Sequence, residues 1–169
     1  YYDVGIAEQH AVAFACGLAK DNMKPYFAVY SSFLQRAYDQ IIHDAAIASL
    51  PVKILVDRAG LIGEDGKTHQ GIFDISLFRP IPNITILSPA SSKDLDLCLN
   101  WAINQNNLVV IRYPKTLLLN SALKSFEFGT WDTICNLQEI NIITYGSDVY
   151  GIYEELRKNE RLLIEKYFQ

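Results

Sequence analysis

Five short apolar runs, separated by longer segments, constrain what this 169-residue chain can fold into. The runs are rich in Val, Ile and Tyr, and they are continuous rather than alternating; they cover 25–30, 52–57, 84–88, 108–113 and 140–146. Continuous apolar strands are typical of parallel sheets that are buried on both faces. Strands that alternate with helices indicate βαβ units. We therefore expect an α/β fold with three layers, α/β/α, around a mainly parallel sheet.

Three segments in the first two thirds of the chain are expected to form helices. The segment 31–49, "SSFLQRAYDQIIHDAAIAS", keeps a helical period, and Ser32 with Gln35 predicts a capping box at its start. The segment "SSKDLDLCLNWAINQ" predicts a second helix, capped by Ser91 or Ser92. Near the N-terminus, 11–19 is apolar or small on every side apart from Gly17, which predicts a helix that is buried all round.

The pattern divides the chain into three regions. Residues 1–116 are expected to form one α/β domain whose N-terminal part is missing, because the chain opens on "YYDVGIAEQH", without a Met, and reaches the buried helix almost at once. Residues 117–138 have no clear period and are interpreted as a linker or an irregular strand pair. Residues 139–169 begin a fresh strand, turn and helix, which predicts the start of a second α/β domain, so the chain is expected to be truncated at both ends.

Charge and cysteine content exclude some classes of partner. The net charge is −4, and no run of Lys or Arg favours nucleic acid or a membrane surface. None of the apolar stretches reaches the roughly 18 residues of a membrane helix. Three cysteines lie far apart without CxxC spacing, which is typical of reduced thiols in a cytosolic protein. We therefore expect a cytoplasmic location; a bacterial cytoplasm, or a plastid-type organelle in a eukaryote, is implied by the family resemblance described below.

Polar side chains follow several of the predicted strands. Tyr30 ends the first run, Arg58 follows the second, and Arg112 lies late in the fourth. Ligands of open α/β sheets bind beyond the carboxyl ends of the strands, so these side chains are candidates for a binding site. An arginine in a buried strand also needs an anion or a carboxylate partner, which we expect for Arg112.

The segment after Arg58 is a candidate active-site loop. It runs "AGLIGEDGKTHQG" and places four glycines around Glu64, Asp65 and His69. Glycine permits close approach of a ligand to the backbone, and long polar loops after strands often carry function. The alternative is an ordinary connection between two elements.

A carboxylate at the head of a buried helix also needs an explanation. Glu8 precedes the apolar segment 11–19, and an unpaired buried charge costs several kcal/mol. A helix-dipole effect would suit an exposed helix start instead. Because a buried carboxylate can hold a proton near neutrality, Glu8 is a candidate acid or base. Simpler roles remain open for His10, as a cap or hydrogen-bonding partner, and for Arg36, as a solvated side chain; His43 and Asp39 are expected at the helix surface.

Four motifs together resemble a known enzyme family. "DVGIAEQHAVAFACGLA", "YSSFLQRAYDQIIHD", "DRAGLIGEDGKTHQGIFD" and "IRYP" occur in the order and spacing of the 1-deoxy-D-xylulose-5-phosphate synthases. These are thiamine-diphosphate enzymes of the transketolase superfamily. The resemblance is close from Tyr2 to about Lys115 and implies the pyrimidine-binding domain of that family, followed loosely by the start of its C-terminal domain.

The resemblance implies how this chain meets the cofactor, thiamine diphosphate. Glu8 matches the glutamate that hydrogen-bonds the aminopyrimidine ring and shares a proton with it. Phe33 matches the aromatic residue that stacks on this ring, and Arg36 is expected with Glu8 and Phe33 among the cofactor-binding residues. The family binds Mg²⁺ through a "GDG" motif followed by an asparagine in its N-terminal domain. This chain has no such motif, so no metal ligands are expected within it.

The resemblance also implies a reaction and the residues that bind its substrates. The family decarboxylates pyruvate and joins the two-carbon unit to D-glyceraldehyde 3-phosphate, the first step of non-mevalonate isoprenoid synthesis, which also feeds thiamine and pyridoxal synthesis. The acceptor substrate and its phosphate would be bound by Tyr30, Arg36, Arg58 and Arg112. Asp65 and His69 would lie near the reacting carbonyl, with His69 as a second catalytic residue beside Glu8. After "RYP" the chain reads "KTLLLN", where the family usually has arginine and glycine.

Other functions stay open at this point. The nearest alternatives are a transketolase, a pyruvate dehydrogenase β-type subunit, and a non-catalytic α/β dimerisation module. The resemblance implies a homodimer, because active sites of the superfamily lie between subunits. We expect the isolated chain to be inactive and to bind the cofactor weakly or not at all, because the domain that holds the diphosphate is missing from it.

Overall fold

The computed structural model describes residues 1–115, 129–130, 132–135, 140–158 and 164–168. The chain divides into two compact units. The first comprises Tyr1–Leu87 and Leu99–Thr116, and the second comprises Ser88–Cys98 and Leu117–Gln169.

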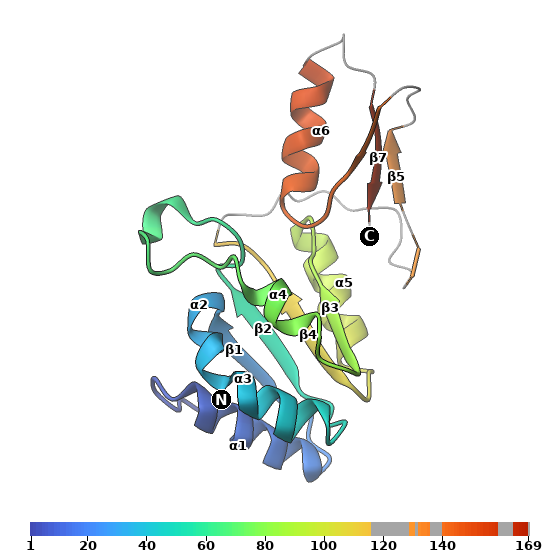
Figure 1. Ribbon diagram of the computed structural model, residues 1–169. Helices are drawn as coiled ribbons and strands as arrows, with labels where there is room; N and C mark the ends of the chain where they lie inside the picture. The colour runs from blue at the N-terminus through green and yellow to red at the C-terminus, as the bar shows by residue number, and fades with distance from the viewer. Residues whose placement is uncertain (116–128, 131, 136–139, 159–163, 169) are drawn as a thin grey trace. The chain divides into compact units, whose positions relative to one another are not determined.

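The first unit is built on a four-stranded parallel sheet (Figure 1). The strands β1 (Tyr26–Tyr30), β2 (Lys53–Asp57), β3 (Ile84–Leu87) and β4 (Leu108–Arg112) lie in the order β1-β2-β4-β3. All neighbouring pairs are parallel. Each strand falls within one of the predicted apolar runs. The two central strands, β2 and β4, are buried almost throughout, which is why their sequences are continuously apolar.

Helices cover both faces of this sheet. On one face, α1 (Glu8–Lys20), the helical segment 31–46 and α4 (Asp74–Phe78) share a core with β2 and β4 that includes Val12, Ile54 and Phe78. On the other face lies the end of α5 (Ser92–Ala102), where the hydroxyl of Tyr26 donates to the carbonyl of Leu99 at 3.3 Å. The predicted three-layer α/β/α fold with a parallel sheet is therefore confirmed.

The segment 31–46 is one helical stretch whose hydrogen bonding changes along its length. It passes from α2 (Ser31–Leu34) through a 3₁₀ turn, η1 (Gln35–Ala37), and α3 (Tyr38–Gln40) to a π-helix, η2 (Ile41–Ala46). It starts immediately after Tyr30, which has extended backbone angles and makes no side-chain cap. The predicted capping box is therefore wrong: β1 leads directly into the helix, and Ser32 already lies inside the first turn.

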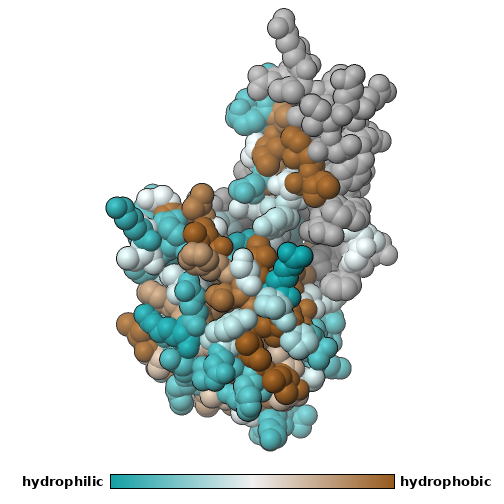
Figure 2. All heavy atoms as spheres, in the orientation of Figure 1, coloured by the Kyte–Doolittle hydropathy of each residue, from teal (hydrophilic) through white to brown (hydrophobic). Residues whose placement is uncertain are grey.

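Helix α1 is buried on one face only. Its buried positions recur every three or four residues and are Glu8, Ala11, Val12, Ala15, Cys16 and Ala19. Ala13 and Gly17 are exposed, and Phe14 and Leu18 are half-buried, so the expectation of burial all round is wrong. The second face is apolar by sequence but is not covered by the described residues. Hydrophobic side chains also reach the surface elsewhere on the face drawn in Figure 2.

Two local predictions can be checked at α5 and at the cysteines. The backbone amide of Asp94 donates to the hydroxyl of Ser91 at 3.1 Å, so Ser91 rather than Ser92 caps α5. Cys16 and Cys98 are buried free thiols, as expected for reduced cysteines. Burial raises the pKa of Cys16 to about 11 and that of Cys98 to about 12.

The second unit contains a three-stranded sheet and one further helix. The strands β5 (Asp132–Cys135), β6 (Ile140–Ile143) and β7 (Ile164–Phe168) lie in the order β5-β7-β6, with β6 parallel and β5 antiparallel to β7. The predicted strand, turn and helix at 140 are present as β6 and α6 (Asp148–Lys158). Of the expected linker, 117–128 lies outside the described residues, and β5 lies near its end. Among the helices described, not one combines the length and apolarity needed to cross a membrane.

Candidate functional site

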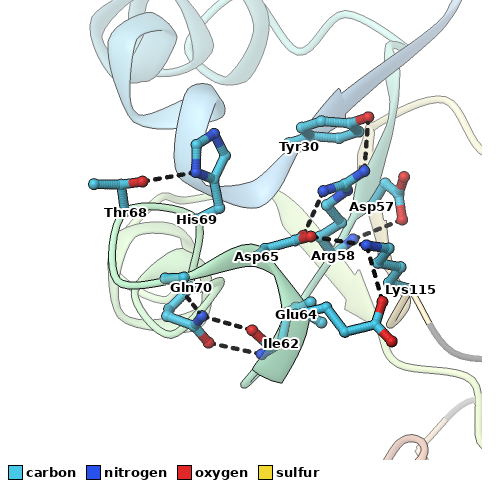
Figure 3. A network of polar contacts seen from close by, with 11 residues as sticks. Tyr30, Asp57, Arg58, Ile62, Glu64, Asp65, Thr68, His69, Gln70 and Lys115 are labelled. Carbon is cyan, nitrogen blue, oxygen red and sulfur yellow. Dashed lines mark hydrogen bonds and ion pairs between the residues drawn. The ribbon is translucent and has the colours of Figure 1, made fainter.

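The carboxyl ends of β1 and β2 bring Tyr30 and Arg58 together, as the sequence predicts (Figure 3). The Arg58 guanidinium donates to the Tyr30 hydroxyl at 3.1 Å, and its Cζ lies 4.0 Å from the centre of the Tyr30 ring. Arg58 also has a φ of +58°, which is uncommon for a residue other than glycine. Such backbone strain persists where the surroundings enforce it, and it clusters at functional sites.

Asp65 lies between two cations. Its Oδ2 accepts a hydrogen bond from Arg58, and its Oδ1 accepts one from the Lys115 ammonium at 2.8 Å. The hydrogen bond from Lys115, together with that from Arg58, lowers the pKa of Asp65 although burial acts the other way. Asp65 in turn raises the pKa of Lys115 and, against the effect of burial, that of Arg58.

Sequence reasoning missed Lys115 as a site residue. It follows β4 by three positions, and its ammonium also lies 3.4 Å from the Glu64 carboxylate. The available signal was a basic residue directly after "RYP", where the resembled family usually has an arginine. The lysine keeps the positive charge at this position but offers a point charge rather than a planar fork.

The glycine-rich loop is closed at its base. The amide of Gly60 donates to the carbonyl of Gly71 at 2.7 Å, and the reverse bond measures 2.8 Å. Within the loop, the side-chain amide of Gln70 bonds the backbone of Ile62 twice and the carbonyl of Gly66 once. A Cβ at Gly71 would overlap the carbonyl oxygen of Arg58, so only glycine fits there. The loop is thus fixed relative to Arg58.

Glu8 is paired rather than isolated. It is 6% exposed, as the sequence argument for burial requires. One nitrogen of the Arg36 guanidinium lies 2.9 Å and 3.0 Å from its two carboxylate oxygens. The same guanidinium lies 5.0 Å from the centre of the Phe33 ring. The ion-pair partner of the buried Glu8 carboxylate is therefore Arg36, which lies one helical turn after Phe33.

Phe33 connects the Glu8–Arg36 ion pair with Tyr30 and His69. Its ring contacts the ring of Tyr30 with centroids 5.5 Å apart and meets the edge of His69 at 5.2 Å. The Nδ1 atom of His69 lies 2.8 Å from the hydroxyl oxygen of Thr68, which orients the imidazole. A continuous set of contacts therefore runs from Glu8 to Lys115. It brings together all but one of the site residues predicted from the sequence.

The exception is Arg112, which forms a separate ion pair. Its Nε lies 2.8 Å from Oδ2 of Asp74, and the two side chains are only 12% and 2% exposed. The predicted carboxylate partner is thus Asp74, at the start of α4. His10 stacks on Phe14 with ring centres 6.0 Å apart, and His43 lies exposed beside Asp44.

A groove of about 570 Å³ opens beside this set of contacts. Glu8, Tyr30 and Phe33 line it together with parts of α1, β1 and the N-terminal segment. The volume is in the usual range for small-molecule sites, which are mainly apolar with a few polar groups. In the part of the chain that the structure describes, no cluster of three His, Cys, Asp or Glu side chains could hold a metal ion.

The sequence is similar to 1-deoxy-D-xylulose-5-phosphate synthases. It is 50% identical over 152 residues to that of Clostridium perfringens (strain SM101 / Type A), covering 88% of this chain and 25% of the relative. It is 51% identical over 148 residues to that of Clostridium kluyveri (strain NBRC 12016), covering 86% of this chain and 24% of the relative. The chain therefore spans about a quarter of the length of these curated relatives.

The fold is similar to that of transketolases. A split-gene transketolase, described as an inactive β4 tetramer, matches with a TM-score of 0.87 at 24% identity, over 99% of this chain and 55% of that one. A Pichia stipitis transketolase matches with a TM-score of 0.83 at 21% identity, over 97% of this chain and 26% of that one. The family model "Transketolase, pyrimidine binding domain" matches residues 1–120. The chain belongs to the transketolase pyrimidine-binding domain family.

Proposed function

We propose that this domain serves in a 1-deoxy-D-xylulose-5-phosphate synthase, which decarboxylates pyruvate and joins the two-carbon unit to D-glyceraldehyde 3-phosphate. The sequence identity of about 50% to synthases of that name supports this assignment of the reaction. The observation that carries the proposal is the buried carboxylate of Glu8 beside the Phe33 ring, at the edge of a groove. A pure scaffold needs neither a buried carboxylate nor a strained arginine at a strand end.

These residues fit an aminopyrimidine ring. The carboxylate of Glu8 and the face of Phe33 already hold a flat, hydrogen-bonding cation, the Arg36 guanidinium. A protonated or amino-substituted ring offers the same chemistry, hydrogen-bond donors at its edge and a π-face. We therefore assign Glu8 and Phe33 to the pyrimidine of thiamine diphosphate, and Arg36, which contacts both of them, to the margin of the cofactor site. When bound, that cofactor supplies a nucleophilic carbon that forms and stabilises carbanion equivalents.

In this proposal each residue has a defined task. Glu8 holds or releases a proton at the ring edge, and Phe33 fixes the plane of the ring. His69, oriented by Thr68 and by the edge of Phe33, orients the substrate carbonyl or passes a proton to it. Asp65 fixes the loop that presents His69.

The acceptor phosphate is assigned to the carboxyl edge of the sheet. Arg58, Lys115 and the Tyr30 hydroxyl provide two cations and a hydrogen-bond donor there, which suit a dianionic phosphate. Arg36 is half-exposed and available to the anionic groups of the substrates. Arg112 is proposed as a further phosphate ligand at this edge, although its ion pair with Asp74 cancels its charge.

Other parts of the proposal concern segments beyond this domain. Mg²⁺ and the diphosphate are assigned to an N-terminal domain, as in the resembled family. A homodimer and a cytoplasmic location are proposed on the same basis. The isolated domain is then expected to be inactive and to bind thiamine diphosphate weakly. Tight, magnesium-dependent binding to the isolated domain would contradict this arrangement.

A substrate comparison tests the reaction. A full-length protein that carries this domain is assayed with pyruvate plus D-glyceraldehyde 3-phosphate, and separately with xylulose 5-phosphate plus ribose 5-phosphate. We expect carbon dioxide and 1-deoxy-D-xylulose 5-phosphate from the first pair only. Turnover of the second pair alone would identify a transketolase instead. Absence of turnover with a loaded cofactor would favour a non-catalytic module.

A further inference from the structure

The Arg36 side chain makes the two contacts that the proposed function assigns to the pyrimidine ring. Its guanidinium bonds both carboxylate oxygens of Glu8, at 2.9 Å and 3.0 Å. It also lies 5.0 Å from the centre of the Phe33 ring. A guanidinium is flat, cationic and rich in N–H donors, so it binds carboxylates and aromatic faces in the same way as an aminopyrimidine. Both groups cannot take the same carboxylate and the same ring face at once.

The two partners of this ion pair differ in their freedom to move. The Glu8 side chain is 7% exposed and is fixed at the head of α1, whereas the Arg36 side chain is 49% exposed. Arg36 lies in the short 3₁₀ turn η1, and it contacts Glu8 and Phe33, two of the residues that line the groove. Its guanidinium can therefore turn into solvent without burying any charge, while the carboxylate stays in place.

We infer that Arg36 is an internal placeholder: its guanidinium occupies the pyrimidine position, keeps the buried Glu8 carboxylate paired, and leaves when thiamine diphosphate binds. This inference rests on the proposed function, because it takes Glu8 and Phe33 as the pyrimidine site. The displaced guanidinium is then free to face the anionic groups of the substrate. Binding of the cofactor thus also releases the Arg36 guanidinium for binding the substrate.

The placeholder makes Arg36 a competitor of the cofactor. An exchange between a half-exposed ion pair and solvent is worth little, so the competition amounts to about a two- to fivefold effect on Kd. Arg36→Met removes the competing cation but keeps a long side chain. Arg36→Lys keeps the charge but loses the planar fork. Gln35→Met, at the exposed neighbouring position, is the matched control.

The experiment is a calorimetric titration of a full-length protein carrying this domain with thiamine diphosphate and Mg²⁺. We expect Kd to fall about two- to fivefold in Arg36→Met, to fall less in Arg36→Lys, and to stay unchanged in Gln35→Met. An unchanged or raised Kd in Arg36→Met overturns the placeholder, and a raised Kd shows Arg36 to be a permanent cofactor ligand. Thermal unfolding of each variant verifies that it is folded.

A double-mutant cycle separates this inference from the proposed function. In a Glu8→Gln background the ion pair is absent and only the contact with the Phe33 ring remains, so Arg36→Met should alter Kd much less than in the wild type. Glu8→Gln alone should weaken binding if the pyrimidine site is assigned correctly. If Glu8→Gln leaves Kd unchanged, the proposed function fails. If Glu8→Gln weakens binding but Arg36→Met does not tighten it, only the placeholder fails.

Discussion

The carboxylate of Asp65 bridges Arg58 and Lys115, which follow two different strands of the sheet. Asp65 thereby attaches the glycine-rich loop to the carboxyl edge of the sheet, and its single negative charge reduces the repulsion between the two cations. The two contacts of Asp65 therefore connect the loop, the strained Arg58 and the segment that follows β4. Several measurements can test this account.

Asp65→Asn should destabilise the protein in a pH-dependent way. The cations lower the pKa of Asp65 below its ordinary value of 3.8. Its stabilising effect is therefore complete above pH 3.8 and is lost as the pH falls through the lowered pKa. In urea denaturation, the difference in unfolding free energy between wild type and variant should stay constant at higher pH and narrow below pH 3.8. A difference that is independent of pH would contradict the ion pairs.

Gly71→Ala should damage the base of the loop. The new Cβ would overlap the Arg58 carbonyl and lie 2.9 Å from both Cα of Ala59 and Cβ of Ser31. Because two of these neighbours are backbone atoms, we expect a loss of about 1–3 kcal/mol in unfolding free energy. Gly63→Ala is the matched control, since nothing lies within 4 Å of a Cβ there and its φ is not positive. Equal effects of the two substitutions would refute the close approach.

Lys53 should make stability rise at alkaline pH. It is fully buried, and its ammonium donates to the carbonyls of Pro51, Gln105 and Asn107. Burial, with a smaller effect from Lys24, lowers its pKa from 10.5 to about 8. Between these values the unfolded state binds more protons, so stability rises with pH, by about 3 kcal/mol at most.

The matched variant for this prediction is Lys53→Met. Unfolding free energies of wild type and variant are compared at pH 7, 9 and 10.5, so that the titration of other groups cancels. The wild type should gain stability relative to the variant over this range. A constant difference would mean that Lys53 titrates in the folded protein as it does in the unfolded chain.

Arg58→Lys should weaken binding of the phosphorylated substrate more than binding of pyruvate. A lysine keeps the charge but cannot reach Asp65 and stack on Tyr30 with one planar group. In the full-length protein we expect KM for D-glyceraldehyde 3-phosphate to rise roughly tenfold. KM for pyruvate should change much less. An equal rise in both would place Arg58 outside the phosphate site.

The fold could be predicted from sequence where the information is local. Continuous apolar runs located β1 to β4, and the position of Arg58 directly after a run placed it at the carboxyl edge of the sheet. The buried face of α1 was harder to assign, because Phe14 and Leu18 are apolar but only half-buried. The capping box failed because β1 leads into the helix without an intervening turn.

The contacts within the site could not be predicted in this way. Glu8 and Arg36 are 28 positions apart, and Asp65 and Lys115 are 50 apart. Sequence periodicity indicates that a carboxylate is buried and needs a partner. It does not identify which distant side chain the fold brings beside that carboxylate. Arg112 illustrates this limit: a carboxylate partner was expected, and only the structure identifies it as Asp74.

The substitution Glu8→Gln tests whether Glu8 binds the pyrimidine of thiamine diphosphate. The amide keeps the shape of the carboxylate but can neither hold a negative charge nor exchange a proton with the ring. The measurement is the rate of 1-deoxy-D-xylulose 5-phosphate formation by the full-length variant at saturating thiamine diphosphate, with far-UV circular dichroism as a control for folding. We expect a folded protein whose turnover falls by about 10²-fold or more. Near-normal turnover would contradict it.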